Sequence, residues 1–286
     1  MDQKIIDLYD EYTHAPLDRH VFLARLAQLT GSTAAAMAMV SLLEANQARA
    51  ALVAPDDQRL EARRMTSAGA TGEIKGYLAY PKGAAKLPAV IVIHENRGLN
   101  PHIEDVTRRM ALEGFLALGP DLLSPLGGTP TNEDTARDMI GKLDAQQTVQ
   151  NLRAAMTFLE KHANGNGKVG AVGFCWGGGM VGELAVNAPD LDAGVVYYGR
   201  QPKAADVEKI RAPLLLQYAG QDARINEGIP AFEEALKKAN KKYTLYIYDG
   251  AQHAFNNDTS EARYSKPAAE QAWSRTIAFF KEHLKA

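Results

Sequence analysis

The chain has a single cysteine among its 286 residues, which excludes an intramolecular disulfide and any metal site built from several cysteines. Its seven histidines show no helical pairing with acidic residues of the metalloprotease kind. No metal and no cofactor is therefore expected. The sequence also lacks internal repeats and low-complexity tracts, which argues against a repeat architecture.

Charge of either sign is nearly balanced. The formal net charge is -2, and no cluster of Lys and Arg with interleaved aromatic residues is present. We therefore expect neither a nucleic-acid partner nor a membrane partner. Hydrophobic residues at 46% and charged residues at 23% are typical of a globular protein. Because α/β domains often reach about 250 residues, one large core is predicted for most of the chain.

Residues 1–55 differ from the rest and are predicted to form a helical extension. Apolar residues recur there at helical spacing and lead into an alanine-rich run at 33–43. We expect the extension to be retained and to pack on the main domain or on a second subunit. The expected protein is a cytoplasmic monomer or homodimer.

An export signal is the alternative interpretation of this segment. Residues 18–23, a weak apolar stretch and the small residues at 47–50 resemble a twin-arginine signal for transport to the periplasm. However, the second arginine is missing, and the preceding stretch is acidic where such a signal is basic. The apolar run is also too short and weak to span a bilayer.

Residues 56–286 show short apolar runs that alternate with amphipathic segments, the pattern of a parallel sheet with helices on both faces. Helical spacing of apolar residues predicts helices around 149–159 and 273–284, and Pro101 suits a first helical position. Continuous apolar runs predict buried strands, whereas the alternating run at 72–80 predicts an edge strand. The buried runs are 88–93, 115–118, 168–174, 193–198, 213–218 and 243–248.

Cys175 directly follows one of these strands and has a glycine two residues to either side, Gly173 and Gly177. A sharp turn from strand to helix exposes the central side chain, and the glycines let the two backbones approach closely. This is the local pattern of a nucleophile. The alternative is a small buried hydrophobic residue, the usual role of a lone intracellular cysteine.

Two further residues complete a candidate triad. Asp222 and His253 each follow a predicted strand, and they come after Cys175 at intervals of 47 (222 − 175) and 31 (253 − 222) residues. The order nucleophile, acid, histidine is that of α/β-hydrolases. An imidazole can take the thiol proton near neutral pH, and a carboxylate fixes its tautomer. Asp249 is the rival acid, but its place next to Gly250 favours a turn.

The other histidines are expected to lie outside the triad. His94 is expected to be a hydrogen-bonded structural residue, and His102 could line a pocket. The remaining four fall on polar helical or terminal positions and are expected to be solvated: His14, His20, His162 and His283.

The loop after the strand at 88–93 should face the same site. In this fold the oxyanion hole combines the N–H that follows the nucleophile with an N–H from an early strand loop, which assigns the donors to Trp176 and Asn96. A buried Glu95 near the thiol would oppose thiolate formation, so its expected use is as proton acceptor or resting partner of Cys175. The alternative for Glu95 is a structural ion pair with Arg97 or another arginine.

With these residues in place, residues 60–286 resemble the dienelactone hydrolase family, also called carboxymethylenebutenolidases. The motifs that carry the resemblance follow the family's order: Gly173-Phe174-Cys175-Trp176-Gly177-Gly178, the Glu95 loop, Tyr197-Tyr198-Gly199, Gly220-Gln221-Asp222 and Gly250-Ala251-Gln252-His253-Ala254-Phe255. The extended sequence 94–100 and the amino-terminal extension are similar to one branch of the family. The resemblance implies an α/β-hydrolase fold and a hydrolase of small-molecule esters or lactones.

The resemblance also implies roles for individual residues. Cys175 would attack the carbonyl, His253 would reprotonate the leaving oxygen, and Glu95 would deprotonate Cys175 when substrate arrives. The family's dienelactone binders carry Ser directly after this histidine and Arg three residues later, where this chain has Ala254 and Asn257.

A substrate carboxylate would therefore need another cation, and the candidates are Arg97, Arg137 and Arg200. Of these, Arg137 best resembles the family's second carboxylate-binding arginine. Trp176 and Tyr198 are expected to line the pocket. Two alternatives stay open: a broad carboxylesterase for neutral esters, and a non-catalytic thiol sensor on a hydrolase scaffold.

Overall fold

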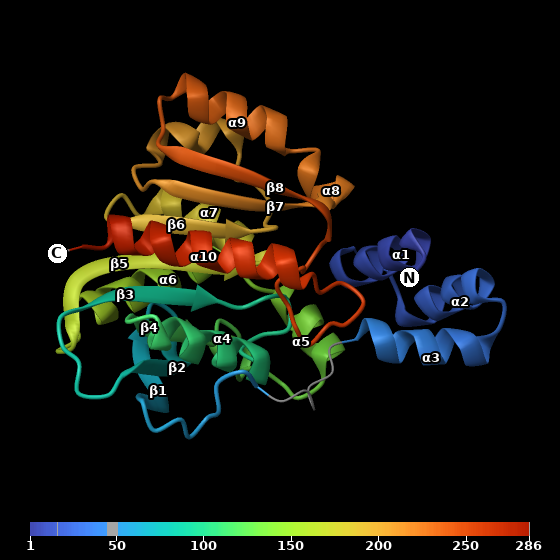
Figure 1. Ribbon diagram of the computed structural model, residues 1–286, viewed down its shortest axis with the longest axis horizontal. Coiled ribbons are helices and arrows are strands. Elements are labelled where there is room, and N and C mark those ends of the chain that lie inside the picture. Colours follow the sequence, from blue (N-terminus) through green and yellow to red (C-terminus); the bar gives the residue numbers. More distant parts are fainter. Residues whose placement is uncertain (16, 45–50, 286) are drawn as a thin grey trace.

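Eight strands form one sheet in the order β1-β2-β4-β3-β5-β6-β7-β8 in this computed structural model, which describes residues 1–15, 17–44 and 51–285 (Figure 1). The pairs β1·β2 and β2·β4 are antiparallel, and every other neighbouring pair is parallel. The predicted mostly parallel sheet is thus confirmed. The strands are β1 (Leu60–Gly69), β2 (Gly72–Pro81), β3 (Leu87–Ile93), β4 (Leu116–Pro120), β5 (Gly165–Phe174), β6 (Ala193–Tyr197), β7 (Leu214–Gln221) and β8 (Tyr243–Gln252).

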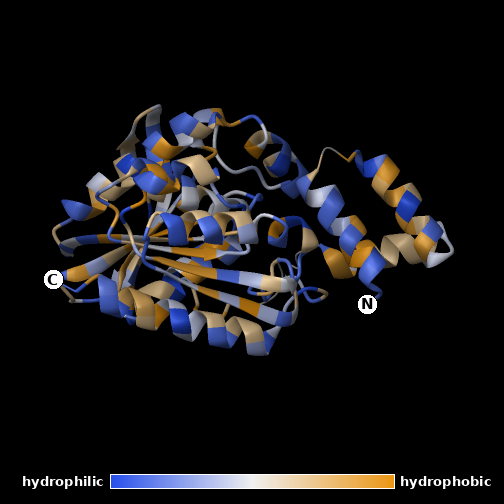
Figure 2. Ribbon diagram, turned by 90° about the horizontal axis from the view of Figure 1, so that it is seen from above, coloured by the Kyte–Doolittle hydropathy of each residue, from blue (hydrophilic) through white to orange (hydrophobic). Residues whose placement is uncertain are grey.

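Helices cover both faces of this sheet, as the sequence predicts (Figure 1). Successive side chains of a strand point to opposite faces, so Ile91 packs under α6 and α7 while Val90 packs under α4 and α10. In Figure 2 the hydrophobic colour runs along the central strands between the helical layers. The helices of this domain are α4 (Pro101–Leu112), η1 (Ser124–Leu126), α5 (Glu133–Ile140), α6 (Ala145–Glu160), α7 (Trp176–Asn187), η2 (Ala204–Lys209), α8 (Ala223–Asn226), α9 (Ile229–Lys238) and α10 (Lys266–His283).

The strand predicted at the sheet edge is not at the edge. β2 lies second, because β1 pairs along its whole length in an antiparallel hairpin. β1 alternates partly buried and exposed residues and contains no continuous apolar run, so the sequence did not indicate it as a strand. The alternation in β2 reflects its mixed surroundings and not a free edge.

Three helices precede the sheet and form the predicted extension: α1 (Gln3–His14), α2 (Arg19–Thr30) and α3 (Thr33–Leu43). Asp2, Asp18 and Ser32 cap their amino ends with side-chain oxygens, which satisfies N–H groups that lack an intrahelical partner. The helices share a small apolar core of their own, in which the rings of Tyr12 and Phe22 stack at 4.3 Å between centroids. The extension lies beyond the carboxyl ends of the parallel strands (Figure 1).

Within the described ranges, no single helix has both the length and the apolar character needed to cross a membrane. α2 and α3 would reach that threshold only jointly, and they are bent by 110° relative to each other. The small-residue sequence at 47–50 of the alternative export signal lies outside the described residues.

Candidate active site

The turn from β5 into α7 holds Cys175 in an unusual backbone conformation, with φ 56° and ψ -117°. A positive φ angle strains the backbone of a residue other than glycine, and such strain is found most often at functional sites. The flanking glycines are required by close contact: a Cβ on Gly173 would lie 2.1 Å from the carbonyl oxygen of Gly177, and one on Gly177 would lie 2.4 Å from that of His94. The predicted elbow is therefore present, with Cys175 buried at the end of a central strand.

Asp222 and His253 meet beside this elbow. Asp222 follows β7 and caps α8, and His253 follows β8. Nδ1 of His253 lies 2.5 Å from Oδ2 of Asp222, and both side chains are buried. Nε2 of His253 has no hydrogen-bond partner among the described residues. Asp249, the alternative acid, is exposed to solvent. The carboxylate that contacts His253 is that of Asp222.

A residue of the extension reaches into this site. Nε2 of His14, the last residue of α1, lies 3.0 Å from Sγ of Cys175, and its ring meets that of His253 edge-on at 4.6 Å. The expectation that His14 is solvated is therefore wrong. The sequence held no signal for this contact, because His14 precedes Cys175 by 161 positions and no motif joins them.

The hydrogen bonds of His14 fix its tautomer. Nδ1 lies 2.9 Å from the carbonyl oxygen of Asp10, which can only accept, so Nδ1 carries the hydrogen. Burial, with the charge of His253 as the next cause, lowers the pKa of His14 well below 6.5 and keeps it neutral. Nε2 then offers a lone pair, and the Cys175 thiol donates to it. The resting partner of the thiol is thus His14 and not Glu95, for which the sequence predicts a role as proton acceptor or resting partner.

His253 has the opposite electrostatic balance. Burial alone would lower its pKa, but the negative charge that Cys175 carries once it has lost its proton, together with that of Asp222, outweighs this and raises the pKa from 6.5 to about 10. Burial opposes ionisation of Asp222 in the same way, yet the charge and hydrogen bond of His253 lower the pKa of that carboxyl below 3.8. An imidazolium next to a carboxylate is the state these shifts favour.

Glu95 is buried at the same cavity and is held by a neutral partner. Its Oε2 accepts a hydrogen bond from Nδ2 of Asn257 at 2.7 Å, while Oε1 has no hydrogen-bond partner among the described residues. The alternative of an ion pair with Arg97 is not found, since Arg97 lies against Glu133 and Asp134.

The loop and arginine candidates contact the extension. Nδ2 of Asn96 donates to the carbonyl oxygen of Thr13 at 2.7 Å. Nη1 of Arg137 donates to the carbonyl oxygen of Tyr12 at 3.0 Å, and its guanidinium lies 4.4 Å from the centre of that ring. These contacts place α1 across the mouth of the site.

Arg263 is a cation that sequence reasoning missed. It is buried, its Nη1 lies 3.2 Å from Oδ1 of Asp10, and its guanidinium lies 4.9 Å from the centre of the Tyr9 ring. Together with Arg97 it lines the cavity at Cys175. No motif surrounds Arg263, and only the fold brings it back to the site after His253.

The cavity that Cys175 and His253 share measures about 20 Å³, room for about one water. Arg200 is exposed near Gly179, and neither it nor Arg137 lines the cavity. Tyr198 is fully buried with its ring 5.1 Å from that of His253. Trp176 stacks on His94 at 5.3 Å, and its N–H lies in the first turn of α7, where N–H groups lack intrahelical partners.

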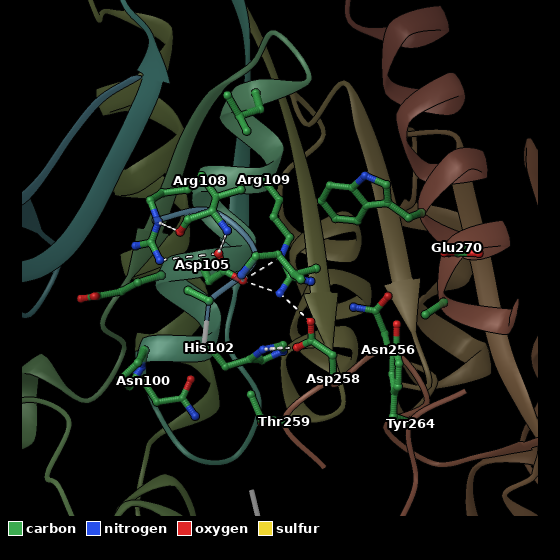
Figure 3. Close-up of a pocket in the computed structure, with 18 of the residues that line it drawn as sticks. Asn100, His102, Asp105, Arg108, Arg109, Asn256, Asp258, Thr259, Tyr264 and Glu270 are labelled. Atoms are coloured by element: carbon green, nitrogen blue, oxygen red, sulfur yellow. Dashed lines mark hydrogen bonds and ion pairs between the residues drawn. The ribbon is translucent and has the colours of Figure 1, made fainter. Parts of the chain in front are cut away.

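Two other histidines behave as expected. His94 is buried and bonded, since its Nε2 accepts from the N–H of Leu122 at 3.3 Å. His102 lines a different cavity of about 880 Å³, shown in Figure 3. There His102 and Arg109 both pair with Asp258, at 3.2 and 2.7 Å. None of Cys175, Asp222 and His253 lines that larger cavity.

Comparison with known proteins identifies the family. Residues 74–284 match the dienelactone hydrolase family. A protein of Saccharolobus solfataricus named "Putative carboxymethylenebutenolidase" is 36% identical over 74% of this chain and 95% of its own length. A protein of the same name from Escherichia coli K12 is 32% identical over 80% and 89%.

Solved structures give the same result. The crystal structure titled "Putative Dienelactone Hydrolase" from Klebsiella pneumoniae has a TM-score of 0.71 and 30% identity, and the match covers 78% of this chain and 99% of that one. A dienelactone hydrolase-like promiscuous phosphotriesterase from metagenomic libraries has a TM-score of 0.72 at 24% identity, over 79% and 100%, and shows the fold alone. The chain has the α/β-hydrolase fold and belongs to the dienelactone hydrolase family of hydrolases.

Proposed function

We propose that this hydrolase cleaves small-molecule esters or lactones with Cys175 as nucleophile, His253 as acid and base, and Asp222 as the carboxylate that orients His253. The observation that carries the proposal is the 2.5 Å contact of Asp222 with His253 beside the strained elbow of Cys175. In such a triad the thiol is the nucleophile, the imidazole is its base, and the carboxylate orients the imidazole.

The reaction begins when the thiol passes its proton to a base and the sulfur attacks the carbonyl carbon. The N–H groups of Trp176 and Asn96 would hold the oxyanion that forms. His253 then donates a proton to the leaving oxygen, which departs as an alcohol or as the opened end of a lactone. Water, deprotonated by His253, finally cleaves the thioester and releases the acid.

Glu95 is proposed as the first base, because its Oε1 is buried at the cavity without a hydrogen-bond partner among the described residues. A carboxylate oxygen can accept a proton from a donor that reaches it. When α1 lies across the site, as it does in this structure, Nε2 of His14 accepts the hydrogen bond of the Cys175 thiol. Departure of His14 would therefore leave Glu95 as the available acceptor.

Substrate entry requires α1 to move. A cavity of about 20 Å³ has no room for an ester. Asp10 pairs with Arg263 at this cavity, so a substrate carboxylate could replace the carboxylate of Asp10 there. Arg97 is the second cation that lines the cavity.

The proposal is tested by hydrolysis of small aryl esters with wild type and Cys175→Ala. Loss of the nucleophile should lower turnover by about 10⁴-fold or more, with an unchanged circular dichroism spectrum. His20→Gln, at an exposed histidine of the extension, is the matched control and should keep its activity. Retained turnover in Cys175→Ala would refute the assignment. A panel of carboxylated lactones and neutral esters separates the two substrate classes.

A further inference from the structure

Three metal-binding side chains converge at the mouth of this site. One ligand atom each of His14, Cys175 and His253 lies within 4.8 Å of the other two. A thiolate and two imidazoles are ligands that suit zinc, and three protein ligands with an open fourth position are typical of zinc sites that also bind water. The cavity they line has room for about one water.

Both imidazoles are already oriented as metal ligands. Nδ1 of His253 is bonded to the carboxylate of Asp222 at 2.5 Å, and Nδ1 of His14 to the carbonyl oxygen of Asp10 at 2.9 Å. Metal-binding histidines almost always donate their second N–H to such an acceptor, which fixes the tautomer. In the neutral form of each ring Nε2 then has the lone pair that binds a metal, and His253 gives up its Nε2 proton when the metal binds. On His253 this atom is buried and unpartnered among the described residues.

The distances require only small side-chain rotations. Tetrahedral zinc with ordinary bond lengths places sulfur and nitrogen ligands about 3.5 Å apart. Nε2 of His14 now lies 3.0 Å from Sγ of Cys175, so this pair would open slightly. The other two separations are within 4.8 Å, so the three atoms are near enough to share one ion.

We propose that His14, Cys175 and His253 form a zinc-binding site that fastens the extension over the active site and holds the enzyme inactive. Binding replaces the thiol hydrogen by a sulfur–zinc bond and the hydrogen on Nε2 of His253 by a nitrogen–zinc bond, and both protons go to solvent. Zinc withdraws charge from the sulfur, which weakens it as a nucleophile, and it occupies Nε2 of His253, which can then no longer transfer protons. His14 lies outside residues 74–284, so one of the three ligands comes from the extension and not from the part of the chain that matches the family. The inhibition rests on the proposed function, whereas the metal binding does not.

Cobalt(II) provides a readout that does not depend on activity, because a cobalt–thiolate bond gives an intense near-ultraviolet absorption band. The reduced, chelator-treated full chain is titrated with cobalt(II), then with zinc(II). We expect a band that saturates at one equivalent and is abolished by zinc. Cys175→Ser should show no band. His14→Gln should weaken cobalt binding by at least about 10-fold, and His20→Gln, in the same extension, should match wild type.

Absence of the band in wild type, or unchanged cobalt affinity in His14→Gln, would overturn the site. Circular dichroism of the metal-free variants establishes folding, and His14→Asn replaces His14→Gln if the latter does not fold. Zinc should also stop ester hydrolysis, with recovery on addition of chelator. If wild type binds cobalt but hydrolyses no ester even after chelation, the metal site stands and the proposed function fails. If it hydrolyses esters equally with and without zinc, the inhibitory role fails.

Discussion

Nδ2 of Asn257 donates a hydrogen bond to Oε2 of Glu95 at 2.7 Å, joining the loop after β8 to the loop after β3. Both side chains are buried. The chain thus holds its buried carboxylate with the amide of Asn257. This hydrogen bond fixes the position of the Glu95 carboxylate at the cavity that Cys175 lines.

Asn257→Ala should therefore destabilise the fold. Removal of the donor leaves a buried carboxylate without its partner, which typically costs about 1–3 kcal/mol. Urea denaturation measures the change in the free energy of unfolding. Asn187→Ala is the matched control, because Asn187 donates to a carbonyl oxygen at an exposed position and should cost at most about 0.5 kcal/mol. Equal losses in the two variants would contradict this role of Asn257.

Much of the fold could be predicted because buried parallel strands are continuous apolar runs, such as the one that ends at Ile93. β1 was missed because its partly exposed residues give no such run. The triad could be proposed because Cys175, Asp222 and His253 each follow a strand. His14 and Arg263 could not, since their contacts depend on how the extension packs on the finished domain, and neither residue stands in a motif.

The elbow glycines give the second prediction, a comparison within one helix. Gly177→Ala places a Cβ 2.4 Å from the carbonyl oxygen of His94 and 2.5 Å from that of Ile93. Because both contacts are with backbone, the variant should lose about 3 kcal/mol or more, or fail to fold. Gly179→Ala in the same helix meets nothing closer than 3.5 Å and should be neutral or gain up to about 1 kcal/mol from helix propensity. Thermal and urea unfolding of both variants decide the matter, and similar stabilities would refute the steric argument.

Weakening the hold of the extension should expose Cys175, which is the third prediction. Arg263→Ala removes the pair with Asp10 and the contact with Tyr9. Alkylation of Cys175 by iodoacetamide should accelerate at least about tenfold. This corresponds to a change of about 1.4 kcal/mol in the free energy with which the extension covers the site. Since the chain has one cysteine, intact mass reports this reaction alone.

Arg25→Ala provides the control for that experiment. Arg25 pairs with Glu11 within the extension, and each side chain is a little under half exposed, at 45% and 43%. Exposed pairs contribute little, so the alkylation rate should stay close to that of wild type. A rate in Arg263→Ala no higher than in Arg25→Ala would show that access to Cys175 does not depend on the Asp10 contact.

The Asp222–His253 pair makes stability depend on pH, which is the last prediction. His253 has its pKa raised from 6.5 to about 10, so its contribution is full below about 6.5 and is lost as the pH rises through about 10. Asp222 has its pKa lowered from 3.8, so its contribution is present above that value and is lost in more acidic solution. The difference in unfolding free energy between wild type and Asp222→Asn should thus be largest at about pH 5.5 and shrink towards about pH 10. Asp249→Asn, at an exposed aspartate near the same site, should show a small difference at every pH. If the difference in unfolding free energy between wild type and Asp222→Asn is constant over this pH range, Asp222 and His253 are in contact but do not form an ion pair.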